Sequence, residues 1–253
     1  YKMKKQRKDR EKKGELTTQQ LVMIIILILS FAIILFFIFR LNLGGTTDRE
    51  ICHDSVVKKS SPVLGKLSGG LNCKTSYTCI SGGGQCDEIT ATNTVNVNAN
   101  NKDEIFRAIA EEMANCWWMF GEGKLDYGAG CAVCSHIDFS EEIENAYPGG
   151  ISYKEFLDSL TKSMNIQKGN ENYLYYLYGV SSLTSLFALE KYSTWQTNYN
   201  NPDLKIPLPG KFLVITKSRG RIFSGKEYSA PEFPFKAEQI SSLGCDNNFL
   251  TKG

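Results

Sequence analysis

The segment of this chain best equipped for chemistry holds two cysteines and a histidine. The stretch GAGCAVCSHIDFS, residues 128–140, carries Cys131 and Cys134 two residues apart, with His136 close behind. Such spacing occurs in thiol redox pairs, in metal-binding knuckles, in haem-attachment sites and in the disulfides of exported domains. Each alternative requires a different compartment, so the rest of the sequence has to establish the compartment first.

Two of the four alternatives fit the segment poorly. A haem-attachment site needs the histidine directly after the second cysteine, and Ser135 intervenes here. A structural zinc site needs four converging ligands, which Cys131, Cys134, His136 and the only other histidine, His53, would have to supply as free groups. Free thiolates are not expected in an oxidising exterior, so the compartment again decides.

The redox alternative depends on the local structure of the segment. A thioredoxin-type pair lies where a strand gives way to a helix, whose N-terminus lowers the thiol pKa. CAVCSHIDF instead alternates as a strand, which puts Val133, Ile137 and Phe139 on one side. Residues three apart in a strand point to opposite faces. We therefore expect Cys131 and Cys134 to form structural disulfides with two different partners.

A long uncharged segment near the start indicates where the chain resides. Residues 21–39 contain no charged side chain and only one polar residue, Ser30. A helix of that length spans about 28 Å, close to the hydrocarbon thickness of a bilayer. The segment exceeds the apolar core of a secretory signal, and no small-residue cleavage site follows it. The sequence predicts a single transmembrane helix over 21–39.

The charges on either side of this segment predict its orientation. Residues 1–13 hold eight Lys or Arg against Asp9 and Glu11, whereas Arg40 is the only basic residue directly after the segment. Basic residues remain on the cytoplasmic side, so we expect a basic cytoplasmic tail at 1–20 and an extracellular C-terminal domain. The predicted partners are the lipid bilayer, further copies of the chain or other envelope proteins. Residues 41–253 are acidic overall, so nucleic-acid binding is not expected.

Two parts of the sequence resemble known proteins. KKGELTTQQ, residues 12–20, resembles the class III signal of archaeal type IV pilin-like proteins, with Lys13-Gly14 as the pair before cleavage. It departs from that pattern at Gln19, where the family carries glutamate, and in an apolar run that starts only at Leu21. ANCWWMFGEGKL (114–125) with CAVCSHIDF (131–139) resembles uncharacterised single-pass membrane-anchored surface proteins of small-genome archaea. The second resemblance implies a source and implies no activity.

The region after the membrane segment is predicted to be one α+β domain with a smaller cysteine-rich part. A stalk is expected at 40–49, a Cys/Gly-rich subregion at 50–87 and an α+β ectodomain at 88–253. Residues 88–100 alternate as a half-buried strand, and Asn100 or Asn101 can cap the helix that follows. A capping box, Ser152 with Glu155, begins another helix, and the apolar segment 173–189 predicts a buried helix or a strand-turn-helix.

All eight cysteines lie in the predicted extracellular part. An even number restricted to that part is typical of a disulfide framework, although eight cysteines allow 105 pairings and the sequence does not choose among them. The disulfide candidates are Cys52, Cys73, Cys79, Cys86, Cys116, Cys131, Cys134 and Cys245. No catalytic signature occurs, so we predict no catalytic residue, no metal and no cofactor.

The function most consistent with these features is a structural or interaction subunit of the cell surface. Trp118 points away from the apolar face of its helix and is either covered by a neighbouring loop or exposed to a partner, and Trp195 is a second interaction candidate. Three alternatives remain open on sequence alone. They are a thiol oxidoreductase that uses Cys131 and Cys134, a pilin-like filament subunit, and a binding module for a glycan or small ligand at the aromatic segment 173–195.

Overall fold

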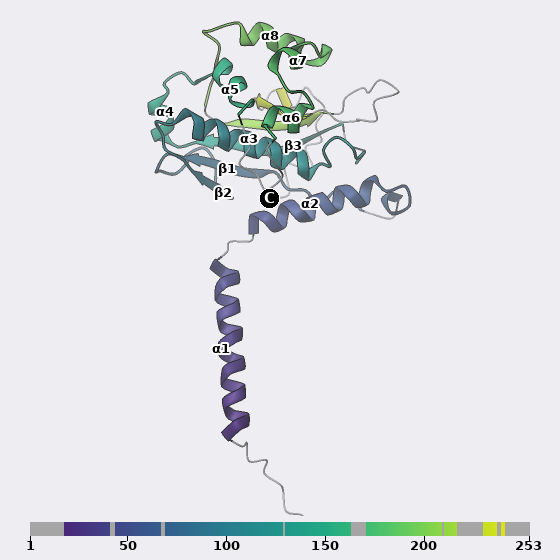
Figure 1. Ribbon diagram of the computed structural model, residues 1–253, viewed down its shortest axis with the longest axis vertical. Helices are drawn as coiled ribbons and strands as arrows, with labels where there is room; N and C mark the ends of the chain where they lie inside the picture. The colour runs from purple at the N-terminus through teal and green to yellow at the C-terminus, as the bar shows by residue number, and fades with distance from the viewer. Residues whose placement is uncertain are drawn as a thin grey trace, which may run out of the picture. The chain divides into compact units, whose positions relative to one another are not determined.

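The computed structural model describes most of the chain after residue 17 (Figure 1). The described residues are 18–40, 44–66, 69–128, 130–162, 171–208, 210–216, 230–236 and 239–240. Most of the basic tail, the signal-like Lys13-Gly14 pair and Cys245 therefore lie outside them. The chain forms two compact units, residues 1–44 and residues 45–253.

In the described part of the first unit the chain forms helix α1 (Thr18–Arg40). It has neither glycine nor proline, and apart from Ser30 every residue from 21 to 39 is apolar, so nothing in its interior interrupts a helix. Apart from Leu35, which is half-buried, the large apolar side chains described along it are 47% to 68% exposed. None of the helices, as far as their residues are described, combines the length and the apolar character that crossing a membrane requires.

The second unit is built on a five-stranded mixed sheet with the strand order β2-β1-β3-β6-β7. Strand β1 pairs in parallel with both β2 and β3, whereas β6 runs antiparallel to β3 and to β7. A small second sheet pairs β4 with β5. The strands are β1 (Ser76–Ser81), β2 (Asn93–Asn96), β3 (Cys131–Phe139), β4 (Ile151–Ser152), β5 (Lys205–Ile206), β6 (Lys211–Thr216) and β7 (Glu232–Phe235). This arrangement confirms the predicted α+β class.

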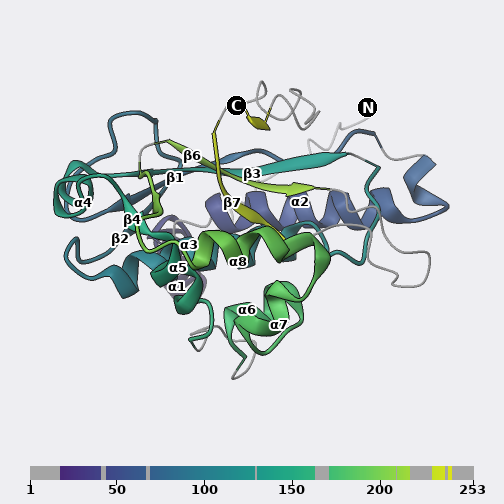
Figure 2. The same ribbon diagram turned by 90° about the horizontal axis from the view of Figure 1, so that it is seen from above.

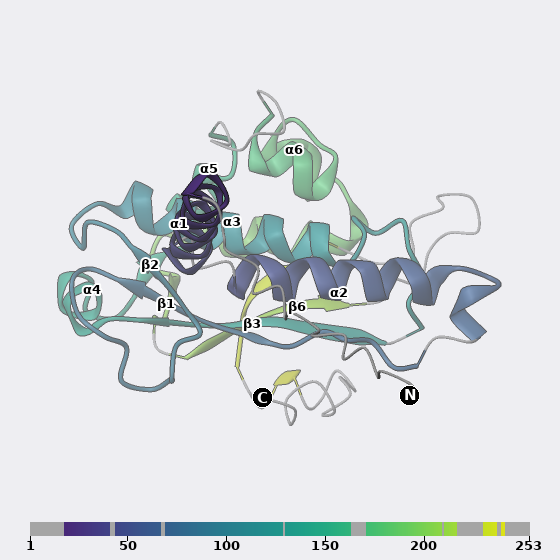
Figure 3. The ribbon, with the colours of Figure 1, turned by 90° about the horizontal axis from the view of Figure 1, so that it is seen from below.

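Two long helices lie along the same face of the sheet, as Figures 2 and 3 show from opposite sides. They are α2 (Gly44–Ser60) and α3 (Lys102–Met119), and α3 connects β2 to β3. Shorter helices pack against α3 or against one another. These are α5 (Tyr153–Ser159), α6 (Tyr173–Tyr178), α7 (Leu183–Phe187) and α8 (Ser193–Tyr199), with the 3₁₀ turn η2 (Glu190–Tyr192). Helix α4 (Glu141–Ala146) follows β3, and the 3₁₀ turn η1 (Leu64–Lys66) follows α2.

The helix starts follow the residues that the sequence offers as caps. The Asn101 side chain accepts a hydrogen bond from the Asp103 N–H at the start of α3. The Ser152 hydroxyl accepts one from the Glu155 N–H at the start of α5, as the predicted capping box requires. The segment 173–189 is two short helices, α6 and α7, separated by Gly179 in the left-handed conformation.

Residues 44–49 of the predicted stalk form the start of helix α2. One expectation differs from the structure. The face assignment along β3 was wrong, because the pairing of β3 with β6 shifts register between Val133 and Ser135. A shift of this kind inserts one extra residue and reverses the alternation of side chains. Val133 consequently packs on the opposite face from Ile137 and Phe139.

Candidate functional site

The cysteines form a covalent framework around the sheet. Every cysteine in the described part of the chain is oxidised. Three pairs are Cys52–Cys73, Cys79–Cys86 and Cys116–Cys134, with Cα atoms 4.4, 5.8 and 5.7 Å apart. These separations lie within the range that a disulfide spans. The first pair ties α2 to the segment before β1, the second closes the end of β1, and the third joins α3 to β3.

The two cysteines of the CxxC segment point to opposite faces of β3. Cys134 lies on the α3 face and bonds Cys116. Cys131 lies on the other face, packed with Val214 and Ile240, and is also in a disulfide. The prediction that the two cysteines bond different partners is therefore confirmed. They do not form a dithiol pair with each other, and the bond to Cys116 leaves Cys134 without the thiolate that redox chemistry or zinc binding would need.

A polar cluster occupies the face of the sheet opposite α3. His136 and Asp138 project there from β3, and the Asp138 carboxylate, only 1% exposed, accepts a hydrogen bond of 3.1 Å from the Gly210 N–H. Burial lowers the pKa of His136, and the negative charges of Asp138 and Glu88 partly oppose that shift. The ring of Tyr77 on the neighbouring strand meets the imidazole edge-on, with centroids 5.9 Å apart.

Gly210 makes this cluster possible. Its φ of +52° is in the left-handed region, and a Cβ at this position would lie 2.7 Å from the Glu88 carboxylate and 3.3 Å from His136 Nε2. Only glycine adopts this backbone at such close approach without strain. Because Gly210 has no side chain, the His136 imidazole and the carboxylates of Asp138 and Glu88 can all lie close to its backbone.

The chemistry open to this cluster is proton exchange. A half-buried, neutral imidazole beside a carboxylate can accept a proton. Ser135, the adjacent hydroxyl, lies toward the α3 face and therefore away from the imidazole. Across the described ranges, no three or more His, Cys, Asp or Glu side chains are grouped so that they could hold a metal ion. Among the described residues, His136 can therefore act as a base, but neither a serine hydroxyl nor a group of metal ligands lies beside it.

The two tryptophans selected from the sequence are both partly covered. The Trp118 ring stacks on His53 of α2, with centroids 4.3 Å apart and planes inclined by 13°. His53 Nδ1 also lies 2.9 Å from the Trp118 carbonyl oxygen. The cover over Trp118 is therefore a helix, where the sequence suggested a loop. Trp195 packs against Tyr178 and Tyr192, with ring centroids 5.8 and 4.8 Å away.

A buried ion pair joins α2 to α3 and was not predicted from the sequence. Arg49 Nη2 lies 2.7 Å from Glu112 Oε1, and the Glu112 side chain is only 7% exposed. Burial raises the pKa of Glu112, while the charge of Arg49 and hydrogen bonds from Arg49 and Thr78 act in the opposite direction. One signal was present in the sequence. At 100° per residue Glu112 falls within about 20° of Ile105, so a charge stands on the apolar face of α3.

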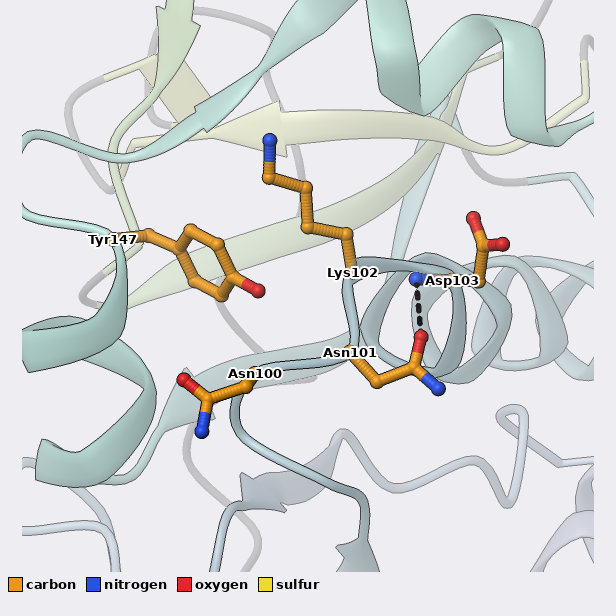
Figure 4. Close-up of a pocket in the computed structure, with 5 residues that line it drawn as sticks. All are labelled: Asn100, Asn101, Lys102, Asp103 and Tyr147. Atoms are coloured by element: carbon orange, nitrogen blue, oxygen red, sulfur yellow. Dashed lines mark hydrogen bonds between the residues drawn. The ribbon is translucent and has the colours of Figure 1, made fainter.

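An open depression of about 570 Å³ lies at the start of α3, between this helix and the end of α4. Figure 4 shows its lining residues, Asn100, Asn101, Lys102, Asp103 and Tyr147. Asn101 is committed to capping the helix, and Lys102 forms a 2.8 Å ion pair with Glu155. The polar groups here therefore serve the local fold.

No protein-family model, no curated protein and no solved structure matches the chain. The two resemblances noted in the sequence therefore remain predictions. The fold and the disulfides define the chain only as an oxidised α+β domain that follows an apolar helix.

Proposed function

We propose that the chain is a membrane-anchored, disulfide-stabilised subunit of the cell surface that assembles with copies of itself or with other envelope proteins. The observation that carries the proposal is the oxidation of every described cysteine. Disulfides persist in oxidising surroundings and are rare where thioredoxin and glutathione keep thiols reduced. A sheet braced by the three disulfides between described residues, with Cys131 in a further one, is suited to an exported protein.

The anchor in this proposal is α1. What supports it is the uncharged run 21–39 together with the exposure of the apolar side chains along the helix. Exposed apolar surface is costly in water, at about 25 cal/mol per Å², and hydrocarbon would remove that cost. The basic residues of 1–13 favour a cytoplasmic N-terminus.

Fractionation of cells that express the full chain tests the anchor. We expect the wild type to remain in the membrane pellet after carbonate extraction. Ile28→Lys combined with Leu29→Lys should release it, because charges at the centre of a span are costly, whereas Ser30→Ala is the matched control and should remain in the pellet. Recovery of the wild type in the soluble fraction would contradict the anchor.

Acid trapping of cells followed by maleimide labelling tests the compartment. Cysteines that are oxidised in the cell do not react, so the mass of the chain should change only after reduction. Extensive labelling before reduction would place the domain in a reducing compartment and would remove the basis of the proposal. The same experiment addresses the thiol oxidoreductase alternative, which requires a reactive thiol at Cys131 or Cys134.

A further inference from the structure

Strand β2 forms one edge of the five-stranded sheet (Figure 1). Its inner side pairs with β1 over Asn93 to Asn96. In the part of the chain that the structure describes, no strand pairs with its outer side. Thr94 and Asn96 are exposed, while Val95 is half-buried against the core. Among the described residues, nothing therefore pairs with this edge along β2.

The backbone of β2 directs hydrogen-bonding groups outward from this edge. The Val97 N–H just past the strand donates to the Ser81 carbonyl of β1 at 2.9 Å. Successive residues of a strand direct their backbone groups to alternate sides. Val95 therefore bonds toward β1 as Val97 does, and the N–H and C=O groups of Thr94 and Asn96 point to the open side.

The β2 edge lacks the features that normally prevent edge-to-edge pairing. Natural sheets protect their edges with Lys, Pro, bulges or a covering element. Residues 89–101 contain neither a charged residue nor a proline. The opposite edge, β7, differs on both counts, because it holds Pro234 and its Glu232 carboxylate is bound by Lys191 at 2.9 Å. Of the two described edges of the five-stranded sheet, β2 is the one that is chemically open to a further strand.

The charged side chains beside the β2 edge can pair with the same side chains of a second copy. A small groove of about 110 Å³ separates β2 from α3, and its α3 wall carries Glu104, Arg107 and Glu111 on one face of the helix. Arg107 is exposed. When two copies meet edge to edge about a two-fold axis, their α3 helices run antiparallel. Arg107 of each copy then faces the acidic residues of the other, which gives charge complementarity.

We propose that the β2 edge pairs with the β2 edge of a second copy, antiparallel, to form one continuous ten-stranded sheet. In the register that we propose, Thr94 of each copy lies opposite Asn96 of the other, and the two Val95 residues face each other. That register joins the outward N–H and C=O groups of Thr94 and Asn96 in hydrogen-bonded pairs. This inference rests on the proposed assembly role and deepens it by naming the partner and the surface.

A second copy suits this edge better than a foreign strand does. A two-fold interface uses the same patch twice, so the patch must complement itself. The uncharged strand meets that condition because no like charges oppose each other across it. The Glu-Arg-Glu face of α3 meets it because an antiparallel copy brings opposite charges together. A strand from another protein would have to supply its own match to both features.

The mass of the full chain in detergent or nanodiscs, measured by light scattering over a dilution series, tests the proposal. The wild type should have a protein mass of twice 28.3 kDa at high concentration. Thr94→Lys places a charge on the edge and should raise the dissociation constant by about tenfold or more. The matched control is Thr197→Lys on the exposed surface of α8, which should leave the dimer intact.

The outcomes separate this proposal from the proposed function. A dimer that withstands Thr94→Lys would overturn the β2 interface while leaving assembly through another surface open. A wild type that is monomeric throughout would also overturn it and would favour a foreign strand, while carbonate extraction of the same material reports on the anchor independently.

Should Thr94→Lys destabilise the monomer, a photoreactive benzoylphenylalanine at residue 94 provides a second measurement. It should cross-link two copies, and the same group at residue 197 should not. Absence of cross-linking at residue 94 would count against the interface.

The charge complementarity is tested by reversal. Arg107→Glu should weaken the dimer, because each α3 would then present only acidic groups to the other. Combining it with Glu111→Arg restores opposite charges and should recover at least part of the affinity. Equal affinity of all three proteins would remove α3 from the interface. It would also overturn the antiparallel arrangement of the two copies.

Discussion

The Arg49–Glu112 ion pair allows a quantitative prediction about how α2 is held. Arg49→Met removes the cation and leaves Glu112 buried beside Thr78 on the α3 face of the sheet. Breaking a buried pair from one side costs about 3–5 kcal/mol, because the remaining charge has lost its partner. Here the loss in unfolding free energy has an upper limit, because Glu112 can take up a proton and so lose its charge.

This upper limit is the free energy of protonating Glu112, which depends on the pH and on the carboxyl pKa. A carboxyl group with an ordinary value of 4.5 costs about 3.4 kcal/mol to protonate at pH 7 and about 0.7 kcal/mol at pH 5, at 1.36 kcal/mol per unit. Glu112 has a pKa raised by burial, so its folded-state contribution is most favourable below the unfolded value and is lost as the pH rises through the folded value. Removing Arg49 raises that pKa further. Because part of this cost is already present in the wild type, Arg49→Met should lose less than about 3.4 kcal/mol at pH 7 and less than about 0.7 kcal/mol at pH 5.

Urea unfolding of the full chain with its disulfides intact, followed by tryptophan fluorescence, measures both values. The matched control is Lys74→Met, which removes an exposed pair with Asp48 at 3.9 Å and should cost less than about 0.5 kcal/mol at either pH. A loss below about 1 kcal/mol at pH 7 for Arg49→Met, or a loss that is the same at pH 5, would refute the assignment of Glu112 as a buried charge that depends on Arg49.

Three further results are expected from the same protein. Replacing Cys116 and Cys134 together by serine opens a loop of 18 residues and should lower the free energy of unfolding by about 3 kcal/mol in chemical denaturation; an unchanged midpoint would mean that the bond contributes nothing. Gly150→Ala should lower the melting temperature, because φ is +100° and the new Cβ would collide with the Ile206 carbonyl, and a melting temperature equal to the wild type would contradict this backbone geometry. The pKa of His136 lies below its ordinary value because of burial, so its stability contribution is present above the unfolded pKa and falls as the solution is acidified. NMR titration of the ring should show a midpoint below 6.5, and a midpoint above that value would exclude a buried imidazole.

The sequence predicted most of the elements whose signals are local. Asn101 and Ser152 start helices as predicted, because their side chains accept hydrogen bonds from the N–H groups of Asp103 and Glu155. The strand 131–139 was also predicted correctly, because its apolar residues alternate with a period of two. The turn after α3 follows from Gly121, whose φ of +77° only glycine adopts easily.

The features that were missed depend on pairing between distant segments. The shift between Val133 and Ser135 is a property of how β3 matches β6, and no residue in β3 alone specifies it. Helix α2 was not predicted because its buried face is not a regular apolar stripe. It joins the domain through an ion pair at Arg49, a disulfide at Cys52 and an aromatic stack at His53.

This composition of α2 links the fold to the compartment. Its inward residues 49, 52, 53 and 56 follow helical spacing along one side of the helix, yet only Val56 contributes ordinary apolar burial. A face of that kind gains little from the hydrophobic effect, so the Cys52–Cys73 bond and the Arg49–Glu112 pair carry a large share of its attachment. Reduction would therefore weaken the hold on α2 more than it weakens the sheet, whose strands are held by backbone hydrogen bonds and a packed core. The attachment of α2 is therefore the part of this domain that depends most on Cys52 remaining oxidised.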